Sequence, residues 1–314
     1  MSLIAPSNRT PESFGRVAVV YGGRSSERAV SLKSGAAVLQ GLLNAGVDAF
    51  GIDLYGEQGL EQPMQQLQAQ PFDRVFIALH GPEGEDGTIQ GALQMLGKPY
   101  SGSEVMASAL GMDKVRCKQL WASQQLPTPN HQMLDDSSDW NALADLLPVM
   151  VKPDHEGSSI GIMRADTTEQ LAEAYRKASQ LDRCVFAERL IVGAEFTVAI
   201  LDGRALPVIR LETPNQFYDY EAKYLADDTH YHFDTGLDTA KDAEIRLLSE
   251  QAFAAVGCTG WGRVDLMQDH QGQFWLLEVN TVPGMTDHSL VPMAARKAGL
   301  SFEQLVVKIL ETAS

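Results

Sequence analysis

The stretch "GWGRVDLMQDHQGQFWLLEVN", residues Gly260–Asn280, contains two apolar runs on either side of the polar segment Asp269–Gly272. Apolar, β-branched and aromatic residues are typical of strands, and a short polar segment that ends in glycine is typical of a turn between them. The stretch therefore predicts a β-hairpin, for which we take a register that places Gln268 opposite Gln273.

In that register Asp265 lies opposite Leu276, and Arg263 lies opposite Glu278. Opposed residues share a face and side chains alternate with a period of two, so Asn280 also lies on this face. Two carboxylates and an amide oxygen suit Mg²⁺ or Mn²⁺, whereas zinc is not expected because no cysteine or histidine accompanies them. The hairpin alone leaves an alternative open: a half-buried salt bridge between Arg263 and Glu278, with Asn280 capping a turn.

The composition narrows the class of protein. A chain of 314 residues suits two or three domains, and 44% apolar with 21% charged residues is typical of a globular protein. The formal net charge of −16 argues against nucleic acid or an anionic membrane as a partner. Residues 1–15 indicate a frayed tail without a signal peptide, no apolar run reaches the length of a membrane span, and the three cysteines are far apart. We therefore expect a cytoplasmic protein.

The first 112 residues contain three apolar segments that predict strands: "RVAVVYGG", "DAFGIDL" and "RVFIALHG". Helical stretches separate them, one reaching Leu43 and a polar one around Met64–Gln68. Strands that alternate with helices predict a parallel α/β domain over residues 1–112, with functional loops at the carboxyl ends of its strands.

The order of predicted strands and helices changes after residue 112 and again after residue 190. A helix over Asp113–Gln124 precedes the predicted strands "VMVK", "SIGIM" and "CVFAERL", with another helix over Thr168–Ser179. This order predicts a small α+β domain over residues 113–190. Residues 191–314 continue with a hairpin about Asp202-Gly203, further strands, a long loop and terminal helices.

Two lysines occupy positions that are unusual for a solvated charge. Lys152 ends the apolar run "VMVK", and the loop after it contains Gly157 and Ser158, which let backbone N–H groups approach phosphate oxygens. Lys114 begins a helix, where the helix dipole disfavours a cation unless it faces an external anion. The pattern indicates a phosphate site, and an edge-strand lysine followed by a serine-rich turn is the alternative.

Four more polar residues stand at the ends of predicted strands or the starts of helices. Glu188 and Glu195 flank a domain junction, where they could hold an adenine amino group and ribose hydroxyls. Glu27 stands at a helix start, where a cap is the simpler explanation, and His80 precedes a glycine-rich turn with three carboxylates. The segment "GGR" does not fit the dinucleotide-binding fingerprint.

Together these segments resemble the D-alanine–D-alanine ligase family, ATP-grasp enzymes of peptidoglycan precursor synthesis. The similar segments follow the family's order from about Arg16 to the end of the chain; they are "GGRSSER", "HGPEGEDGTIQG", "MDK", "VKPDHEGSSIG", "AERLIVGAEFTVAI", "YDYEAKY", "GWGRVDL" and "LLEVNTVPGMTDHSLVP". The loop sequence "PDHEG" within the fourth of these segments is less familiar in this family than the other matching segments. The resemblance implies a three-domain ATP-grasp architecture, ATP with two Mg²⁺ or Mn²⁺ ions, two molecules of D-alanine as substrates, and a homodimer.

The resemblance also implies a role for individual residues. The ATP phosphates would be held by Lys114, Lys152 and Lys223. The adenine and ribose would be held by Glu188, Leu190, Ile191, Glu195 and Phe217. The two metal ions would be bound by Asp265, Glu278 and Asn280. The first D-alanine would be bound by Glu27 with Ser158 and Tyr224, and further substrate contacts would come from His80 and Tyr218. Arg263 and the backbone near Gly284 would stabilise the oxyanion, and Ser289 and Leu290 at a helix start would receive the carboxylate of the second D-alanine.

The implied reaction begins with attack of the first carboxylate on the γ-phosphate of ATP, and the amine of the second D-alanine then displaces phosphate. The segment Glu212–Phe233 is too long and too aromatic for a plain linker, and we expect a lid that closes over the acyl phosphate; a loop packed permanently on the surface is the alternative. Three other functions remain to be weighed: an ATP-grasp ligase with another acceptor, a nucleotide-binding regulatory protein, and an NAD-linked dehydrogenase, which lacks its fingerprint.

Overall fold

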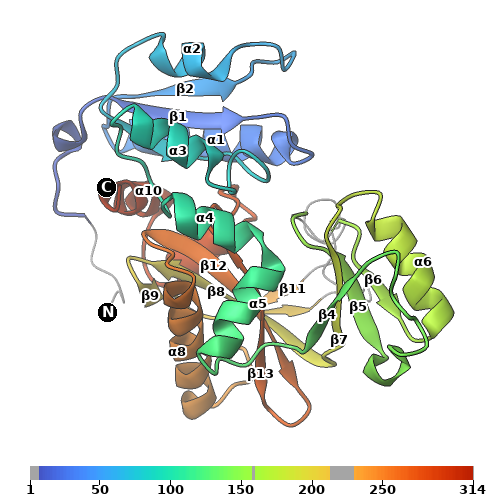
Figure 1. The fold of residues 1–314 in the computed structure, drawn as a ribbon. Helices are drawn as coiled ribbons and strands as arrows, with labels where there is room; N and C mark the ends of the chain where they lie inside the picture. The colour runs from blue at the N-terminus through green and yellow to red at the C-terminus, as the bar shows by residue number, and fades with distance from the viewer. Residues whose placement is uncertain (1–6, 158–159, 213–229, 314) are drawn as a thin grey trace.

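The computed structural model describes residues 7–157, 160–212 and 230–313, and its strands form three sheets (Figure 1). The first sheet is parallel, with the strand order β2–β1–β3. The elements of this part are η1 (Pro11–Phe14), β1 (Val17–Gly22), α1 (Arg28–Asn44), β2 (Ala49–Leu54), α2 (Pro63–Gln68), β3 (Arg74–Ile77), α3 (Thr88–Met95) and α4 (Val105–Met112). The predicted parallel α/β unit is therefore confirmed.

The second sheet is antiparallel, in the order β4–β7–β5–β6, and α6 covers one of its faces. The elements here are α5 (Lys114–Ser123), β4 (His131–Leu134), η2 (Ala144–Leu146), β5 (Val149–Pro153), β6 (Met163–Ala165), α6 (Thr168–Ala178) and β7 (Val185–Arg189). The strand predicted at "SIGIM" was placed too early. Gly161 has a φ of +75°, outside the extended region, so the strand begins only at Met163.

The third sheet is also antiparallel, in the order β11–β10–β8–β12–β13, with β9 paired to β8. The elements are β8 (Gly193–Leu201), β9 (Arg204–Ala205), β10 (Ile209–Glu212), β11 (His230–His232), α8 (Thr239–Ala255), β12 (Trp261–Asp269), β13 (Phe274–Asn280), α9 (Leu290–Lys297) and α10 (Phe302–Glu311). The predicted turn between β8 and β9 is confirmed: Asp202 and Gly203 both have positive φ angles.

The hairpin of β12 and β13 forms as predicted, but its register differs. Gln268 pairs with Phe274, so the predicted pairing of Gln268 with Gln273 was wrong by one residue. Leu266 then lies opposite Leu276, and both are buried in the core beneath the sheet. The turn contains one more residue than the sequence pattern had suggested.

A β-bulge in β13 changes the register a second time. Asp265 pairs with Glu278 and Arg263 pairs with Asn280, which makes Leu277 the extra residue. Without it, a period of two would turn Glu278 toward the buried face of the strand. The bulge moves both polar residues of β13 to the face of Arg263 and Asp265. The predicted grouping of these four side chains is confirmed, although the opposed pairs are not those predicted.

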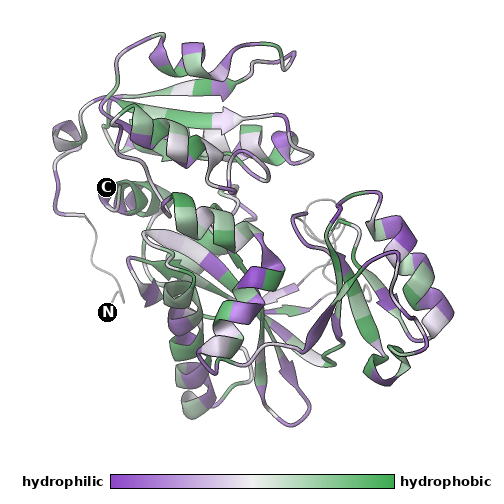
Figure 2. Ribbon diagram, in the orientation of Figure 1, coloured by the Kyte–Doolittle hydropathy of each residue, from purple (hydrophilic) through white to green (hydrophobic). Residues whose placement is uncertain are grey.

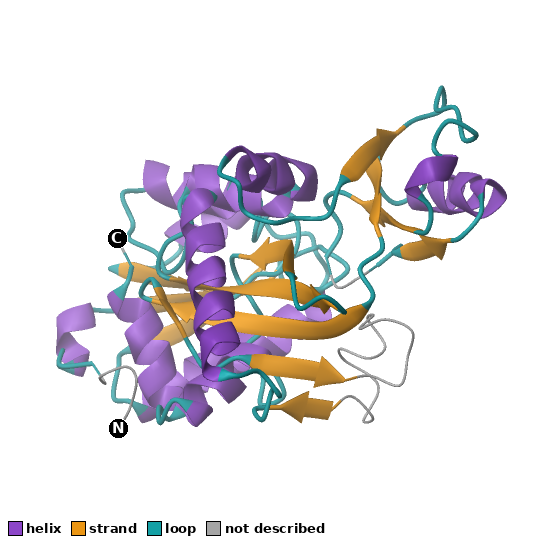
Figure 3. Cartoon of the chain, turned by 90° about the horizontal axis from the view of Figure 1, so that it is seen from below, coloured by secondary structure: helices purple, strands orange, loops and turns teal. Residues whose placement is uncertain are grey.

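The last two helices return to the first sheet. One continuous core contains Val19 of β1, Leu42 of α1, Val291 of α9 and Ile309 of α10. The strands of the first sheet contain many hydrophobic residues, whereas hydrophilic residues are prominent on α6 (Figure 2). Seen from below, the second sheet and α6 lie at one end of the long strands of the third sheet (Figure 3).

Among the helices described in the structure, none combines the length and the apolar composition that a membrane span needs. The longest of the described helices, α1 and α8, have 17 residues each.

Candidate active site between the three sheets

The acidic face of β12 and β13 is organised around Asp265, which is 7% exposed. Arg263 donates to both of its carboxylate oxygens, from Nε at 2.8 Å and from Nη2 at 2.7 Å. Thr197 Oγ1 donates to the same carboxylate at 2.6 Å and Asn280 Nδ2 at 3.2 Å. The sequence alternative paired Arg263 with Glu278, whereas the structure gives Arg263 a bidentate ion pair with Asp265.

Lys114 connects this face to the loop after β5. Its Nζ lies 4.0 Å from Oε2 of Glu278 and donates to the carbonyl oxygens of Asp154, at 3.2 Å, and Glu156, at 2.7 Å. Asp113 precedes it as the N-cap of α5 and accepts from the backbone N–H of Arg116. A cation therefore stands at the N-terminus of α5 because carbonyl dipoles and a carboxylate offset the unfavourable helix dipole.

Residues from all three parts of the chain line one pocket. Glu85 comes from the turn before α3, Lys114 from α5, Gly157 from the loop after β5, and Glu278 and Asn280 from β13. The sequence singled out four of these five residues. The pocket brings together the acidic face, the predicted phosphate loop and the carboxyl end of the parallel sheet.

Glu188 of β7 is buried between two lysines. Lys152 forms an ion pair with its Oε1, and Lys118 lies 2.6 Å from its Oε2. Burial raises the pKa of Glu188, but the two ammonium groups outweigh burial and hold that pKa below its ordinary value. Burial is the main cause of the lowered pKa of Lys118, which the negative Glu188 only partly opposes. The single carboxylate offsets the charge of only one of the two lysines, so the group has a net positive charge while both lysines are protonated.

Lys118 was missed by sequence reasoning. It lies one helical turn after Lys114 on α5, and its Nζ is also 3.2 Å from Oγ1 of Thr128, which in turn donates to the backbone of Leu276. The signal available in the sequence was the i, i+4 spacing of the two lysines, which places both on one face of the helix. That face points toward β7 and β13.

Glu27 is the N-cap residue of α1, yet its side chain makes no capping hydrogen bond and is only 7% exposed. The simpler explanation from the sequence, a cap, is therefore wrong. Two glycines pack closely against its Oε2. A Cβ added at Gly157 would lie 2.7 Å from this oxygen, and a Cβ added at Gly81 would lie 2.9 Å from it. The carboxylate thus faces both the phosphate loop and the glycine-rich turn after β3.

Glu85 in that turn was not singled out by sequence reasoning. Its carboxylate accepts from the backbone N–H groups of Gly81, at 2.7 Å, and Val282, at 3.3 Å. Burial, with the nearby negative charge of Glu27 as the second cause, raises the pKa of Glu85 from 4.5 to about 8. Its position inside the "HGPEGEDG" turn was the only signal in the sequence.

His80 is buried directly before this turn. Its Nδ1 donates to the carbonyl of Val282 at 2.8 Å, and its Nε2 lies 3.2 Å from Oγ of Ser34. Burial lowers the pKa of His80 and favours the neutral imidazole. The same Ser34 oxygen accepts from the backbone of Met285, so His80 belongs to a network that joins β3, α1 and the segment after β13.

The segment after β13 leads into α9. Ser289 is the N-cap residue of this helix and Leu290 its first residue, so the predicted helix start is confirmed. Ser289 Oγ accepts from the backbone N–H of Thr286 at 2.9 Å, and a Cβ added at Gly284 would lie 3.0 Å from that oxygen. This places the Gly284 backbone close to the N-terminus of α9.

The remaining predicted residues are spread along β7 and β8 or lie outside the described part. Leu190 and Ile191 form the short connection between these strands, where the N–H of Leu190 donates to Pro148, and Glu195 lies on β8 opposite Met267. Five predicted residues lie outside the described residues, as does most of the predicted lid: Ser158, Phe217, Tyr218, Lys223 and Tyr224.

The donor set of the acidic face fits a hard divalent cation. Glu278 offers carboxylate oxygens, and Asn280 turns its Nδ2 toward Asp265, which leaves its amide oxygen for a ligand. The oxygens of Asp265 accept hydrogen bonds from Arg263, Thr197 and Asn280, so Asp265 would join the donor set when a cation takes the place of one of these donors. These residues therefore fit Mg²⁺ or Mn²⁺.

Solved structures share this architecture. The chain is similar to D-alanine–D-alanine ligase from Bacillus anthracis complexed with ATP, with a TM-score of 0.82 and 31% identity over 95% of this chain and 97% of that one. It is also similar to the VanG D-Ala:D-Ser ligase of Enterococcus faecalis, with a TM-score of 0.82 and 28% identity over 95% of this chain and 98% of that one. Two antiparallel sheets with lysines and carboxylates between them define an ATP-grasp ligase.

Sequence comparison identifies the family within this class. Family models described as "D-ala D-ala ligase N-terminus" and "D-ala D-ala ligase C-terminus" match residues 53–103 and 120–311. A D-alanine–D-alanine ligase of Stutzerimonas stutzeri is 57% identical over 307 residues, which cover 97% of this chain and 96% of that protein. One of Chromohalobacter salexigens is 55% identical over 300 residues, 95% of this chain and 94% of that protein. The chain belongs to the D-alanine–D-alanine ligase family.

Proposed function

We propose that this protein joins two molecules of D-alanine to D-alanyl-D-alanine and converts ATP to ADP and phosphate, as a step in peptidoglycan precursor synthesis. Family membership supports the proposal, and one structural observation carries it: Lys114, Gly157, Glu278, Asn280 and Glu85 line a single pocket. In this proposal the pocket would combine groups that bind phosphate, metal and substrate.

ATP would lie between the second and third sheets. Lys114 and Lys152 would contact its phosphates, together with Lys223 outside the described residues. Lys152 now pairs with Glu188, and it must turn from that carboxylate to reach a phosphate. Because Lys118 pairs with the other oxygen of Glu188, the buried carboxylate keeps one cation when Lys152 leaves. Leu190, Ile191, Glu195 and Phe217 would complete the adenine and ribose contacts.

Asp265, Glu278 and Asn280 would hold Mg²⁺ or Mn²⁺, and we propose two ions. When bound, the ions supply electrostatic stabilisation of the transferring phosphoryl group. Arg263, fixed by its bidentate contact with Asp265, stands beside them as a positioned cation for the negative charge that develops on the substrate.

The first D-alanine would place its ammonium group at Glu27, supported by Ser158 and Tyr224, with His80 and Tyr218 as further contacts. Its carboxylate attacks the γ-phosphate of ATP, and the amine of the second D-alanine displaces phosphate from the acyl phosphate. Arg263 and the backbone at Gly284 stabilise the tetrahedral oxyanion. The N-terminus of α9 at Ser289 and Leu290 receives the second carboxylate. We further propose a cytoplasmic homodimer, with residues 212–233 as a lid.

The test is ADP release by the full-length protein with ATP and Mg²⁺, measured with and without D-alanine, and mass spectrometry of the product. We expect ADP release to depend on D-alanine and D-alanyl-D-alanine to accumulate. D-Serine and D-lactate as second acceptors distinguish a ligase of other specificity, which would form the mixed product in preference. ATP binding without any turnover would instead support a regulatory protein.

A further inference from the structure

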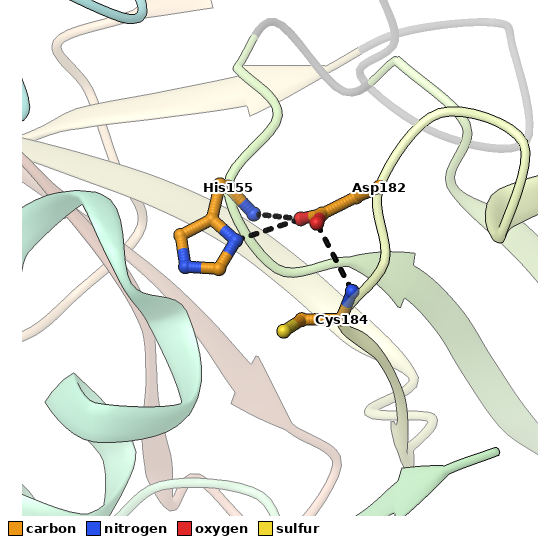
Figure 4. A group of neighbouring side chains, drawn as sticks. All are labelled: His155, Asp182 and Cys184. Atoms are coloured by element: carbon orange, nitrogen blue, oxygen red, sulfur yellow. Dashed lines mark hydrogen bonds and ion pairs between the residues drawn. The ribbon is translucent and has the colours of Figure 1, made fainter.

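A histidine, an aspartate and a cysteine come together outside the groups assigned to ATP and D-alanine (Figure 4). His155 belongs to the loop after β5, while Asp182 and Cys184 belong to the segment between α6 and β7. Nδ1 of His155 lies 2.8 Å from Oδ2 of Asp182, and one ligand atom from each of the three residues lies within 4.8 Å of the other two. The three atoms are a nitrogen, an oxygen and a sulfur.

We infer that His155, Asp182 and Cys184 form a site for a transition-metal ion of the zinc class, separate from the acidic face of β12 and β13. Imidazole, thiolate and carboxylate are the ligands that Zn²⁺ and Co²⁺ take in proteins, whereas Mg²⁺ takes oxygen ligands. The neutral imidazole would bind the ion through Nδ1 and carry its single ring proton on Nε2, while the thiol would lose its proton to solvent and bind as thiolate. Three protein ligands leave a fourth position for water.

The carboxylate of this site is held in place by the backbone. Oδ2 of Asp182 accepts from the backbone N–H of His155 at 2.7 Å, and Oδ1 accepts from the backbone N–H of Cys184 at 3.0 Å. The backbones of both other ligands are thereby tied to the carboxylate, so the three residues need little rearrangement to enclose an ion. The side chain of His155 is 37% exposed, which leaves an entry path from solvent.

The other nitrogen of His155 faces two further carboxylates. Nε2 lies 3.6 Å from Oδ2 of Asp113 and 3.9 Å from Oδ2 of Asp154, side chains that are 5% and 4% exposed. Metal-bound histidines usually turn their second ring N–H toward a carboxylate, which fixes the tautomer and strengthens the metal ligand. His155 resembles this arrangement: Nδ1 contacts Asp182, while Nε2 faces two buried carboxylates at distances slightly beyond hydrogen-bond length.

A plain ion pair between His155 and Asp182 accounts for two of the three residues, but it gives no role to the sulfur of Cys184. The place of His155 in the chain also connects the cluster to the candidate active site. The carbonyl oxygens of its two neighbours, Asp154 and Glu156, accept hydrogen bonds from Nζ of Lys114. An ion at His155 would therefore restrain the loop on which this lysine depends.

The test uses the full-length protein freed of metal with a chelator and titrated with Co²⁺, whose thiolate charge-transfer absorption reports sulfur bound to the ion. We expect this absorption in the wild-type protein and its loss in Cys184→Ser. Cys258→Ala is the control, because Cys258 lies in a separate core. Absence of the band in the wild type, or its survival in Cys184→Ser, overturns the proposal. The proposal is also overturned if the band is lost in Cys258→Ala but not in Cys184→Ser.

Calorimetric titration with Zn²⁺ gives an independent measure. We expect His155→Gln and Asp182→Asn to weaken binding by more than the roughly 10- to 100-fold lost when only a partner of a metal ligand is replaced, with thermal melting to show that each variant is folded. Excess Mg²⁺ should leave Zn²⁺ binding unchanged, since the two ions take different ligands. Equal Zn²⁺ affinity in folded variants and wild type, or competition by Mg²⁺, would assign the ion to the acidic face and refute the site.

Discussion

The ammonium group of Lys118 lies 2.6 Å from a carboxylate oxygen of Glu188, and the two side chains are only 1% and 2% exposed. So close a buried pair fixes the carboxylate that also binds Lys152. Removing one partner of a buried ion pair is costly when it leaves the other charge uncompensated, but without Lys118 the carboxylate of Glu188 would still face Lys152.

Replacing Lys118 by Met should therefore lower the stability of the protein and weaken ATP binding. We expect the free energy of unfolding to fall by less than the roughly 3–5 kcal/mol that an uncompensated buried charge costs, because Lys152 still pairs with Glu188. The KM for ATP should also rise, since Glu188 would then retain Lys152 and withhold it from the phosphates. Denaturant titration and ATP-dependent kinetics measure the two effects. Lys33→Met, at an exposed position of α1, is the control and should change neither. Wild-type values for Lys118→Met would show that the pair is dispensable.

Replacing Glu278 by Gln should abolish turnover and leave the fold intact, because the change removes the charge of a metal ligand and keeps its shape. Circular dichroism and ADP release measure fold and turnover. Gln273→Glu, at the other end of the same hairpin, is a control that alters charge away from the acidic face. If Glu278→Gln retained near-wild-type activity and Mg²⁺ dependence, the residue would have no metal-binding role. Unfolding of this variant would make its role structural.

Replacing Gly157 by Ala should impair binding of the first D-alanine. An added Cβ would lie 2.7 Å from Oε2 of Glu27, closer than nonbonded atoms tolerate, so the carboxylate has to move. We expect the KM for D-alanine at this site to rise on the order of tenfold or more. Gly91→Ala is the matched control on α3, where the nearest atom would be 3.9 Å away. An unchanged KM for Gly157→Ala would place the first substrate elsewhere.

The half-buried Glu85 should make the free energy of unfolding depend on pH. Its folded-state pKa of about 8 lies above the ordinary 4.5, so the folded protein binds the proton more tightly than the unfolded chain does. The contribution is therefore fully present below about pH 4.5 and is lost as the pH rises to about 8. Denaturant titrations at several pH values across this window should show that the free energy of unfolding falls less with rising pH in Glu85→Gln than in the wild type. Glu57→Gln, an exposed carboxylate, should follow the wild type; identical curves for Glu85→Gln would contradict the raised pKa.

The sequence predicted which polar residues of the hairpin share a face, but not how they come to do so. Gln268 was paired one residue away from its true partner, and the extra residue Leu277 was not foreseen. Hydrophobic pattern cannot reveal this bulge, because Leu277 is as apolar as the strand residues around it. The shifted register and the bulge offset each other. The prediction that four polar residues share one face was therefore correct, although it had assumed a regular hairpin.

Burial of charge was the other feature that the sequence concealed. Lys118 and Glu85 look like ordinary residues of a helix and a polar turn, and only packing from distant segments buries the first and half-buries the second. Lys114 and Lys152 were recognised because each contradicts its local setting, a helix start and an apolar strand end. Local patterns reveal a residue that conflicts with its own element, and they miss one whose unusual environment comes from elsewhere in the chain.

The shared core of the parallel sheet with α9 and α10 has a consequence for synthesis on the ribosome. Val19 leaves the ribosome long before Val291 and Ile309, which belong to the same core. Domains usually fold in the order of their synthesis, and this one cannot complete its core until α10 has emerged. A nascent chain that contains the parallel sheet but still lacks α9 and α10 must therefore keep an apolar surface exposed.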